Sequence, residues 1–596
     1  MLEDIIAIPA PLLPPHLALV CRIISDAFDE GSSPQTDSLI ERSLGPSVKP
    51  HRGEIAFKTF LLASDRNLTP KQVADTACSA LLKYPDLIAH TNIDLPYVNI
   101  SLNYSAFANQ LVNISTYIES SIIQANKTIV IEHTQPNTHK ALHIGHLRNT
   151  ILGDTIYRLL RLFYMRAYAV DYHGDEGMHV ARVVWFIKNH YPDIRDIEPS
   201  GSWLGDIYPQ AVSLSEAPND APDSKIRNDI SDTLKNIENR SGKDFEIWSI
   251  TRRWSLDYFK SIYEWLGVHF DDEFCESAVS VASQNRVDEY LKKGVFVESE
   301  GAIGCDLNEY DLGFCLLRKS DGTGLYATKD VELLIERYSK YHFDACIYVV
   351  DKRQHRHFQQ VFHTVHKMGY AAGLKCHHLA YDVVKTKEGG LSSRKGGAIS
   401  AHALLNRLTE IANENIRRRG GSNEPSEDME TAAHDIALAS IRYGMLKVDA
   451  QKPITFDIEG WSNVEGNTGP YLLYTVSRMG SILRKADKSI DDIITISNNK
   501  SELLSLLSHD RERIMLDAIL RAPSVIHESA SQLRPSILCS FIFNLSQLFN
   551  SYYSEVKILS EPNHLLRAAR LQLLETLVGL YKIIFALLGI NVVERL

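Results

Sequence analysis

Hydrophobic positions between Lys127 and Val184 change their spacing twice, and this change predicts the elements that the stretch forms. The apolar run IVIE is followed by a polar turn, by a helical pattern that begins at His-Ile-Gly-His, and by a second apolar run in MRAYAVDY. Strand, helix and strand in this order are typical of a βαβ unit, which implies a parallel sheet with its ligand site at the carboxyl ends of the strands. Apolar runs return in DACIYVVDKRQ and HLAYDVVKTK, so we expect a Rossmann-like α/β domain over residues 123–400.

The stretches on either side of this domain have other patterns. Residues 1–122 mix short helical segments such as PKQVADTACSALLKY with the strand-like YVNISLNYSA, which predicts an N-terminal α+β accessory domain. Polar helical segments over about 187–313 indicate helical material inserted into the sheet domain. Beyond Ala401 the pattern is almost entirely helical, with a connecting segment over 401–461, a break at SNVEGNTGPY and an all-α bundle over 462–596.

One apolar stripe in the last segment is long enough to predict a helix by itself. Its members follow one another at steps of four and three residues, which places them on one helix face. The stripe consists of Leu533, Ile537, Phe541, Leu545, Leu548, Tyr552 and Val556. We expect these side chains in the core of a helical bundle.

Composition narrows the setting of the protein without identifying its chemistry. The 596 residues are 44% hydrophobic and 23% charged, which is ordinary for a soluble chain of several domains. The eight cysteines include no C-x-x-C pair, so we expect neither a disulfide framework nor a structural metal, in a reducing cytoplasmic setting. Glu3 and Asp4 stand where a signal peptide carries basic residues, and no apolar run reaches the roughly 18 residues of a membrane span. The net charge of −11 does not indicate a nucleic-acid partner, although a local basic stripe is compatible with it.

Candidate chemistry is concentrated at the start of the helix that follows the first apolar run. A helix N-terminus at the edge of a parallel sheet offers unpaired N–H groups and a positive dipole to a phosphate chain. His143 and His146 lie three residues apart, so both side chains can face that site, and Gly145 has no Cβ to keep a base or ribose away. Donors at the oxygens of an α-phosphate suit the transfer of a nucleotide. The tetrapeptide alone is also compatible with two core histidines.

A basic, glycine-rich loop further along the chain supports the nucleotide interpretation. It reads GLSSRKGG over residues 390–397, and Arg394 and Lys395 can neutralise the outer phosphates of ATP. His-Ile-Gly-His after a strand, together with such a loop, resembles the paired signatures of class I aminoacyl-tRNA synthetases, where the second is usually Lys-Met-Ser-Lys-Ser. The resemblance implies that Ser392 and Ser393 contact ATP as well.

The resemblance becomes specific to the arginyl-tRNA synthetase family over most of the chain. It is carried by HTQPNTHKALHIGHLRNTILGD, YHGDEGMHVARVVWF, SDGTGLYATKD, YVVDKRQHRHF and NTGPYLLYTVSRMGSILRK. That family holds the guanidinium and α-amino groups of arginine with carboxylates, amides and a tyrosine, and the matching positions here are Glu132, Asn137, Tyr326, Asp330 and Gln354. A planar cation with five donors needs acceptors of this kind, which could reject a lysine-like competitor by about 10⁴.

The chain departs from the family's pattern in the segment after MRAYAVDY. The family's common Gly-Asp-Trp-Gly-Thr-Gln is replaced by GDEGMH, so the resemblance extends only to Gly174 and Asp175, as positions on the ATP side. No role is expected for Glu176 or His179, where the residue types differ.

The second signature also lacks its first lysine, because Gly390 stands there. Arginyl enzymes without that lysine often carry one just ahead of the His-Ile-Gly-His helix. Lys140 has this position, so we expect it to supply the missing charge beside the triphosphate. For a lone lysine in a polar turn, a solvated surface side chain is the alternative.

The resemblance implies that ATP with magnesium activates arginine to arginyl-adenylate, and that the arginyl group is transferred to the 3′ end of tRNA(Arg). The bundle over 462–596 would bind the anticodon, the accessory domain would touch the tRNA elbow, and activation would wait for tRNA to dock. Contacts to tRNA are expected from Arg478, Arg484, Lys485, Tyr552 and Tyr553, although one tyrosine of the pair is expected in the core. We expect a monomer without membrane association.

Two alternatives remain at this point. A nucleotidyltransferase acting on a small molecule could use the same two histidines without RNA, although the long helical C-terminal segment speaks against it. An inactive paralogue that binds tRNA or a protein is the other, and the presence of His143, His146, Lys140 and Arg394 speaks against that one.

Overall fold

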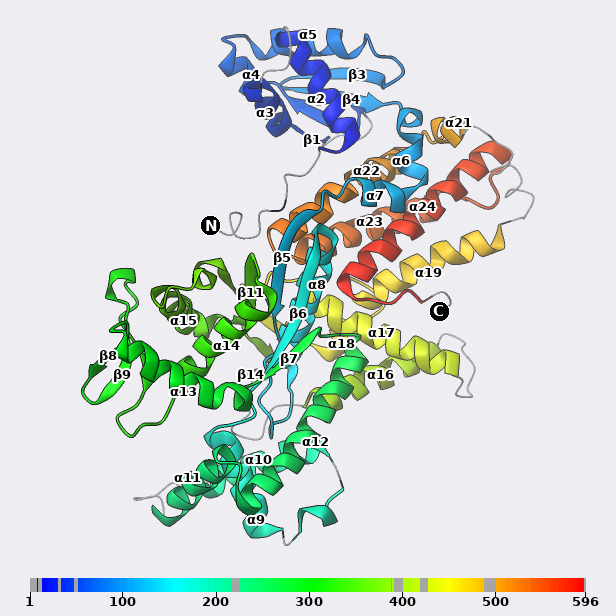
Figure 1. Cartoon of the computed structure of the whole chain (residues 1–596). Coiled ribbons are helices and arrows are strands. Elements are labelled where there is room, and N and C mark those ends of the chain that lie inside the picture. Colours follow the sequence, from blue (N-terminus) through cyan, green and yellow to red (C-terminus); the bar gives the residue numbers. More distant parts are fainter. Residues whose placement is uncertain are drawn as a thin grey trace. The chain divides into compact units, whose positions relative to one another are not determined.

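The computed structural model describes residues 8, 13–29, 34–47, 52–191, 193–198, 200–215, 224–386, 389–390, 400–418, 427–486 and 500–593 (Figure 1). The chain forms two compact units, which we describe separately. The first consists mainly of Gln124–Asn463. The second combines Pro9–Ile123 with Val464–Ala530 and Ile537–Leu596.

A five-stranded parallel sheet organises the first unit. Its strands run in the order β12-β11-β5-β6-β7. The strands are β5 (Ala125–Glu132), β6 (Tyr164–His173), β7 (Asp272–Cys275), β11 (Ala345–Asp351) and β12 (Cys376–Tyr381). The chain leaves the central strand β5 towards β6 on one side and later returns to β11 on the other. The carboxyl end of β5 is therefore a topological switch point, where open α/β sheets bind their ligands.

Helices and two small sheets complete the first unit. The helices are α8 (Ile144–Phe163), α9 (Met178–His190), α10 (Gly201–Ser215), α11 (Ser224–Glu238), α12 (Gly242–Leu266), α13 (Glu276–Lys292), α14 (Tyr326–Tyr341), α15 (His355–Lys367), α16 (Ala401–Arg418), α17 (Glu427–Leu446) and α18 (Ile458–Trp461). The small sheets have the orders β10-β9-β8 and β14-β13-β15. Their strands are β8 (Val297–Ser299), β9 (Ala302–Asp306), β10 (Phe314–Arg318), β13 (Val384–Thr386), β14 (Gly389–Gly390) and β15 (Ile454–Phe456).

The stretch over about 187–313, expected to be inserted helical material, contains strands as well as helices. Helices α10 to α12 and α13 do lie there, but so do the sheet strand β7 and the hairpin strands β8 and β9. Strand β7 has only four residues, and all three residues of β8 are exposed, so neither produces an alternating pattern along the sequence.

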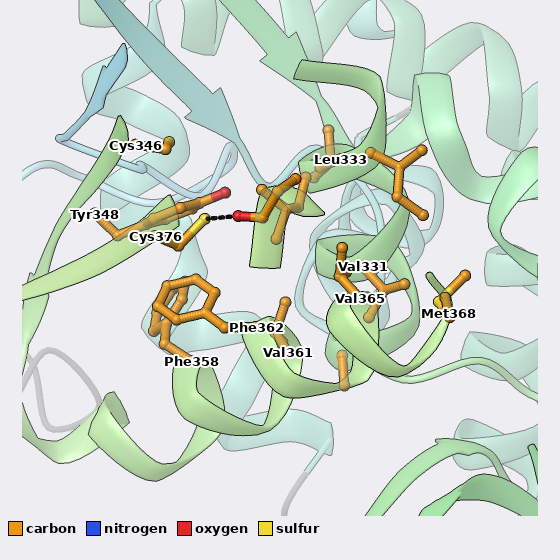
Figure 2. Packing of buried hydrophobic residues seen from close by; sticks show 14 of the residues in the cluster. Val331, Leu333, Cys346, Tyr348, Phe358, Val361, Phe362, Val365, Met368 and Cys376 are labelled. Atoms are coloured by element: carbon orange, nitrogen blue, oxygen red, sulfur yellow. Dashed lines mark hydrogen bonds between the residues drawn. The ribbon is translucent and has the colours of Figure 1, made fainter. Parts of the chain in front are cut away.

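A hydrophobic core between β11, α14 and α15 fixes these elements to one another (Figure 2). The ring of Tyr348 on β11 lies 5.2 Å from the rings of both Phe358 and Phe362 on α15, measured between centroids. Cys376 packs in the same core and its thiol donates a hydrogen bond of 3.2 Å to the carbonyl of Ala372. This core holds the start of α14 and the end of β11, which carry several of the predicted arginine-binding residues.

The second unit contains an antiparallel sheet of order β1-β2-β4-β3 and a set of long helices. The strands are β1 (Leu44–Pro46), β2 (Ile55–Lys58), β3 (Ile88–Asp94) and β4 (Tyr97–Leu102). The helices are α2 (Pro15–Phe28), α3 (Pro34–Ser43), α4 (Phe60–Asp65), α5 (Pro70–Leu81), α6 (Ala108–Val112), α7 (Ile114–Ser120), α19 (Gly469–Lys485), α21 (Lys500–Ser505), α22 (Asp510–Ser531), α23 (Ser536–Glu555) and α24 (His564–Leu588). The predicted fold class, with a parallel-sheet domain, an α+β N-terminal part and a helical C-terminal part, is confirmed.

The stripe predicted from Leu533 to Val556 is only partly right. Both residues lie outside α23. The buried positions within the helix are Ser536, Leu538, Cys539, Ile542, Leu545, Ser546, Phe549 and Tyr552, so the face is rotated by about one residue from the predicted one. Spacing alone does not define which of two adjacent apolar residues, such as Leu548 and Phe549, points inward.

Among the described residues, one helix is long and apolar enough to cross a membrane by length and composition. This is α24, and 67% of its most apolar window is buried inside the protein. Such burial is typical of the core helix of a bundle.

Candidate active site

The turn between β5 and α8 has an unusual backbone. Thr134, Gln135 and His139 have positive φ angles of 77°, 51° and 62°, a conformation that costs about 1–3 kcal/mol each for residues with a side chain. Hydrogen bonds hold it in place: the N–H of Thr134 donates to the Asn149 amide oxygen at 2.9 Å, and the N–H of Gln135 donates to the Asp171 carboxylate at 3.0 Å. The turn is therefore shaped before any ligand arrives.

Helices α10 and α12 hold the same turn from another side. The ring of His139 forms a hydrogen bond of 2.7 Å with the Thr251 hydroxyl, and the N–H of His139 donates to the Ser255 hydroxyl at 3.0 Å. Burial lowers the pKa of His139 to about 3, so its ring is neutral. A Cβ on Gly205 would lie 2.5 Å from the Cβ of Ala141, which shows how closely α10 approaches the turn.

His143 and His146 are oriented by the start of α8. Nδ1 of His143 accepts from the N–H of Gly145, and Nδ1 of His146 accepts from the N–H of His143, both at 3.1 Å. Burial lowers the pKa of both rings, so they are neutral and the single ring proton must be on Nε2. Their centroids lie 4.0 Å apart. The pair thus presents two Nε2–H donors from one helix N-terminus.

Gly145 has a second reason to lack a side chain. A Cβ at this position would lie 2.9 Å from the ring of His143. The glycine therefore makes room for the histidine that caps the helix, in addition to keeping the N-terminus open.

Lys140 lies beside this pair of histidines. Its ammonium lies over the ring of Tyr208 on α10, 5.0 Å from the centroid. Burial is the largest cause that lowers the pKa of His143, His146 and His179, and the positive charge of Lys140 lowers the pKa of all three further. The side chain is half-buried, so it is not the solvated surface lysine that a polar turn alone would suggest.

The second signature falls on residues that lie outside the described part of the chain, including Ser392, Ser393, Arg394 and Lys395. Its flanking residues are described. Gly390 ends the short strand β14. Ser400 forms a β-bridge with His143, and the N–H of Ala401 donates to the carbonyl of Leu142 at 2.7 Å. Ser400, the first described residue after the signature, therefore lies next to His143.

Arg148 on α8 connects the two signatures through the backbone. Its buried guanidinium donates to the carbonyls of Asp382 and Val383, which lead into β13, and to those of Ala450 and Lys452, which lead into β15. Burial lowers its pKa to about 10. Arg148 is not among the site residues predicted from the sequence, because its only signal there is an arginine two positions after His146 on an otherwise buried helix.

Glu132 ends the central strand β5 and is buried. Its carboxylate pairs with the guanidinium of Arg337 on α14 and accepts a hydrogen bond of 2.6 Å from the side chain of Gln135. Burial raises the pKa of Glu132 to about 7, although the charge of Arg337 lowers it. This predicted arginine-binding residue therefore already has a guanidinium partner inside the chain.

The other predicted arginine-binding residues come from the same edge of the sheet. Asp330 on α14 forms an ion pair of 2.6 Å with His357 on α15. Tyr326, one helical turn earlier on α14, is 59% exposed. Gln354, in the short turn after β11, is exposed as well. The side-chain oxygen of Asn137 lies 2.3 Å from where a Cβ on Gly174 would be.

Asp175 is fully buried with both carboxylate oxygens engaged. They accept from the N–H of Ser277 at 2.8 Å, from its hydroxyl at 2.7 Å and from the Arg252 guanidinium at 2.6 Å. The side chain thus faces the start of α13. Two neighbours that had no expected role are also buried: Glu176 pairs with Lys329 at 3.1 Å, and the ring of His179 lies 3.4 Å from the carbonyl of Gly174.

Glu276 is a site residue that the sequence analysis missed. It is buried at the carboxyl end of β7, where Oε1 accepts from the ammonium of Lys329 at 2.8 Å. Within the described part of the chain Oε2 has no hydrogen-bond partner, and it lies 3.6 Å from where a Cβ on Gly174 would be. Recognising β7 as a sheet strand would have pointed to Glu276, because it follows that strand directly.

Tyr172 on β6 shows that these carboxylates line a common space. Burial raises its pKa well above the usual value, and the charges of Glu276, Asp330 and Glu132 raise it further. Two strand ends, those of β5 and β7, and the helix α14 therefore carry acidic side chains whose charges act on one phenol. Such a cluster suits a cationic ligand.

Comparison with known proteins identifies the family. The catalytic domain described as "tRNA synthetases class I (R)" matches residues 107–458, and the domain described as "DALR anticodon binding domain" matches residues 472–596. An arginine–tRNA ligase of Bdellovibrio bacteriovorus is 33% identical over 577 residues, covering 96% of this chain and 97% of that protein. The chain belongs to the arginyl-tRNA synthetase family.

Other members of the family are similar over nearly their whole length. An arginine–tRNA ligase of Treponema denticola is 29% identical over 568 residues, with 93% of this chain and 95% of that protein covered. The solved arginyl-tRNA synthetase of Thermus thermophilus shares the fold with a TM-score of 0.75 at 23% identity, covering 97% of this chain and 99% of that chain. That of Plasmodium falciparum has a TM-score of 0.74 at 20% identity, covering 97% and 98%. The predicted resemblance is confirmed, and a small-molecule nucleotidyltransferase is excluded.

The arginyl-tRNA synthetase family binds tRNA through its anticodon-binding domain, which here matches α19 to α24. Arg478, Arg484 and Lys485 are exposed on α19, and the Arg478 guanidinium lies 5.6 Å from the centroid of the Tyr553 ring. Tyr553 is 42% exposed. Tyr552 is the tyrosine of the pair that lies in the core, as the stripe predicted, because its ring is 1% exposed and its hydroxyl donates to the Glu512 carboxylate at 2.6 Å. It is therefore not available for stacking on a base.

Members of this family use ATP, typically together with Mg²⁺, so the site has to accommodate a metal ion. The described residues include no group of three or more His, Cys, Asp or Glu side chains that could hold a metal ion. The nucleotide side of the site instead presents neutral histidines and one ammonium, which are donors for phosphate oxygens.

Proposed function

We propose that this site carries out the reaction of its family, the ATP-dependent ligation of arginine to tRNA, with arginyl-adenylate as the intermediate. The main support is that two kinds of groups lie at the carboxyl edge of one parallel sheet. His143 and His146 offer Nε2–H donors at a helix N-terminus, and buried carboxylates gather around Tyr172. The first set suits a phosphate, and the second suits a guanidinium.

The nucleotide half of the proposal assigns ATP to the start of α8. His143 and His146 donate to the α-phosphate, where charge develops as the phosphorus is attacked. Lys140 neutralises the phosphates that leave, together with Arg394 and Lys395 of the second signature. Gly145 keeps the helix start open, and Gly174, Ser392 and Ser393 line the nucleotide. Magnesium enters with ATP, because Mg²⁺ commonly binds through substrate phosphates and keeps several waters.

The arginine half assigns the substrate to the space around Tyr172. Asp330 and the free oxygen of Glu276 accept from the guanidinium, with Tyr326 as the aromatic wall. Asn137 and Gln354 accept from or orient the α-amino acid end.

In this proposal Glu132 and Asp175 do not contact the substrates. Glu132 holds Gln135 in the turn, and Asp175 holds the start of α13 from the ATP side, since the oxygens of both are engaged within the chain. Both therefore support the site instead of contacting a ligand.

The chemistry needs two displacements. A carboxylate oxygen of arginine attacks the α-phosphorus of ATP, the bond to the bridging oxygen breaks, and pyrophosphate leaves with the electron pair. A hydroxyl of the 3′-terminal adenosine of tRNA(Arg) then attacks the arginyl carbonyl, its proton is lost, and AMP leaves. The chain's residues contribute by holding both substrates in line and by stabilising charge.

The remaining assignments concern tRNA and the setting. Residues 462–596 form the proposed anticodon-binding domain, with phosphate contacts from Arg478, Arg484 and Lys485 and base stacking on Tyr553. Residues 1–122 form the proposed accessory tRNA-binding domain, and 123–400 the catalytic domain with its connecting helices over 401–461. We further propose a cytoplasmic monomer.

Charging of tRNA tests this function directly. Mixed tRNA and ATP are incubated with the full-length protein and each labelled amino acid in turn, and arginine alone should become attached. Charging of lysine, glutamate or another amino acid where arginine is not charged contradicts the specificity. Absence of any charging, with tRNA binding retained, would support an inactive paralogue instead.

A further inference from the structure

Lys329 on α14 lies buried between two glutamates. Its ammonium donates to Oε1 of Glu276 at 2.8 Å and to Oε2 of Glu176 at 3.1 Å. Glu276 starts α13 at the end of β7, whereas Glu176 belongs to the segment after β6. Three separate elements therefore contribute one charged side chain each to a buried cluster, which we call the Lys329 triad.

The Lys329 triad adjoins the proposed arginine pocket. Lys329 precedes Asp330 directly and lies three residues after Tyr326, so it shares a face of α14 with that tyrosine. Because Lys329 binds Oε1 of Glu276, the orientation of that carboxylate is restricted and the partner-free Oε2 is left on the side of Gly174 and Asn137. The triad therefore directs one acceptor towards the ligand.

The charges in the triad also do not cancel. One ammonium between two carboxylates leaves a net charge of about −1 when all three groups are ionised. A lysine alone beside a pocket for a cation would repel the ligand, and a neutral Lys329–Glu276 pair would attract it little. Glu176 supplies the extra negative charge, at a position where the chain departs from the family's common tryptophan.

We propose that Lys329 is a positioning residue for arginine recognition, which orients Glu276 towards the substrate, and that Glu176 is the counter-charge that keeps the triad attractive to a cation. This inference rests on the proposed function, since it needs arginine in the space around Tyr172. It adds two residues to the determinants of substrate binding, and neither of them contacts the substrate.

The protonation of Glu276 gives the proposal a measurable signature. Burial raises the pKa of Glu276 to about 7, and the charge of Lys329 lowers it. Loss of that charge should raise the pKa further and leave a protonated, neutral acid at pH 7. The other ionisable groups around the triad are Asp175, Asp330, Tyr172, Tyr326, His179 and Glu238. Lys329→Met also removes a charge that lowers the pKa of His179, Glu238 and Tyr326, so comparison with Glu276→Gln shows whether a shift between variants comes from Glu276.

The experiment compares aminoacylation by the full-length protein and three variants between pH 6.5 and 8.5. Lys329→Met should raise the KM for arginine about tenfold or more at pH 7 with the KM for ATP within about twofold, and the defect should shrink towards pH 8.5. Lys329→Arg should stay within about threefold, because it retains a cation that reaches both glutamates. Lys340→Met removes an exposed lysine from the same helix and serves as the matched control.

A merely structural role would have another outcome. Lys329→Met would then lower the melting temperature and impair arginine and ATP parameters alike at every pH, which would overturn the inference. If that variant fails to fold, Glu176→Gln continues the test, because it leaves Lys329 in place. An unchanged KM for arginine in Glu176→Gln would overturn the role of the counter-charge.

Glu276→Gln separates this inference from the proposed function. If Glu276→Gln raises the KM for arginine and Lys329→Met does not, the pocket is right and the role of Lys329 is wrong. If Glu276→Gln itself leaves the KM for arginine unchanged, the assignment of the pocket is wrong and the inference fails with it.

Discussion

The carboxylate of Glu132 and the guanidinium of Arg337 form an ion pair in which the side chains are only 3% and 2% exposed. The guanidinium lies 5.0 Å from the centroid of the Phe274 ring and donates a hydrogen bond of 3.1 Å to the hydroxyl of Tyr348. The guanidinium of Arg337, an arginine of the chain itself, is thus bound at the end of the central strand β5, beside the pocket proposed for the substrate arginine. The pair connects the hydrophobic core under β11 to the turn that carries Gln135.

Removing Arg337 should destabilise the fold strongly. Arg337→Met leaves the Glu132 carboxylate buried without its partner, which typically costs about 3–5 kcal/mol. The free energy of unfolding, measured by urea denaturation, should fall by that amount. Adding Glu132→Gln should recover part of the loss, because a neutral amide replaces the unpaired charge. A double variant as unstable as Arg337→Met would contradict this account.

Asp330→Ala should weaken arginine binding selectively. The substitution removes one of the two carboxylate acceptors proposed for the substrate guanidinium, and truncation of one partner of such a pair costs about 2–5 kcal/mol. The KM for arginine should rise accordingly while the KM for ATP changes little. Glu132→Ala should raise the KM for arginine too, but together with a loss of stability. Equal effects of Asp330→Ala on arginine and ATP would show that the pocket is assigned wrongly.

Lys140→Ala should impair the activation step. Loss of a preorganised charge at the leaving pyrophosphate should lower kcat for adenylate formation by about 10²-fold or more, with little change in arginine binding. Gly390→Lys should restore part of the activity in that background and add little to the intact enzyme. Lys319→Ala, at an exposed lysine of the same unit, is the control. Full activity of Lys140→Ala would refute the compensation between the two signatures.

Arginine activation should be slow until tRNA binds. Asp330, a carboxylate of the proposed pocket, already has a partner in the chain, since it pairs with His357 at 2.6 Å. Substrate arginine must displace this imidazole, and tRNA docking can supply the free energy for that rearrangement. Pyrophosphate exchange should therefore be much faster with tRNA(Arg) than without it. Equal rates would rule this out.

Acid should destabilise the turn through its buried histidines. Burial lowers the pKa of His139 to about 3 and that of His133 to about 4, from a usual value of 6.5. Their contribution to stability is present above pH 6.5 and is lost as the pH falls below it, because the unfolded chain takes up protons first. Glu132 has the opposite effect, since its raised pKa favours the folded state below pH 7.

A comparison with His139→Gln isolates the contribution of one histidine from these opposing effects. The free energy of unfolding of the wild type minus that of the variant should decrease between pH 6.5 and about 4. A difference that does not change with pH would mean that His139 is not held neutral in the folded protein.

Local sequence patterns determined the elements that carry the nucleotide signature. The apolar run before Glu132 and the helical period after His143 extend over 8 and 20 residues in β5 and α8, so the periodicity was strong enough to identify both. The family resemblance likewise rested on contiguous motifs. These features depend on residues that are close together in the sequence, within the length of about one helix or strand.

Only the tertiary structure decided which charges meet. Glu132 and Arg337 are far apart along the chain, as are Glu276 and Lys329, and no periodicity relates them. The same holds for Tyr552, which lies next to Tyr553 but is buried because α23 rotates it towards Glu512. A side chain's partner and burial depend on how the elements pack, and packing joins residues that the sequence separates. The sequence by itself therefore determined the strands, the helix and the histidines of this site, whereas packing decided which of its carboxylates are left free for a ligand.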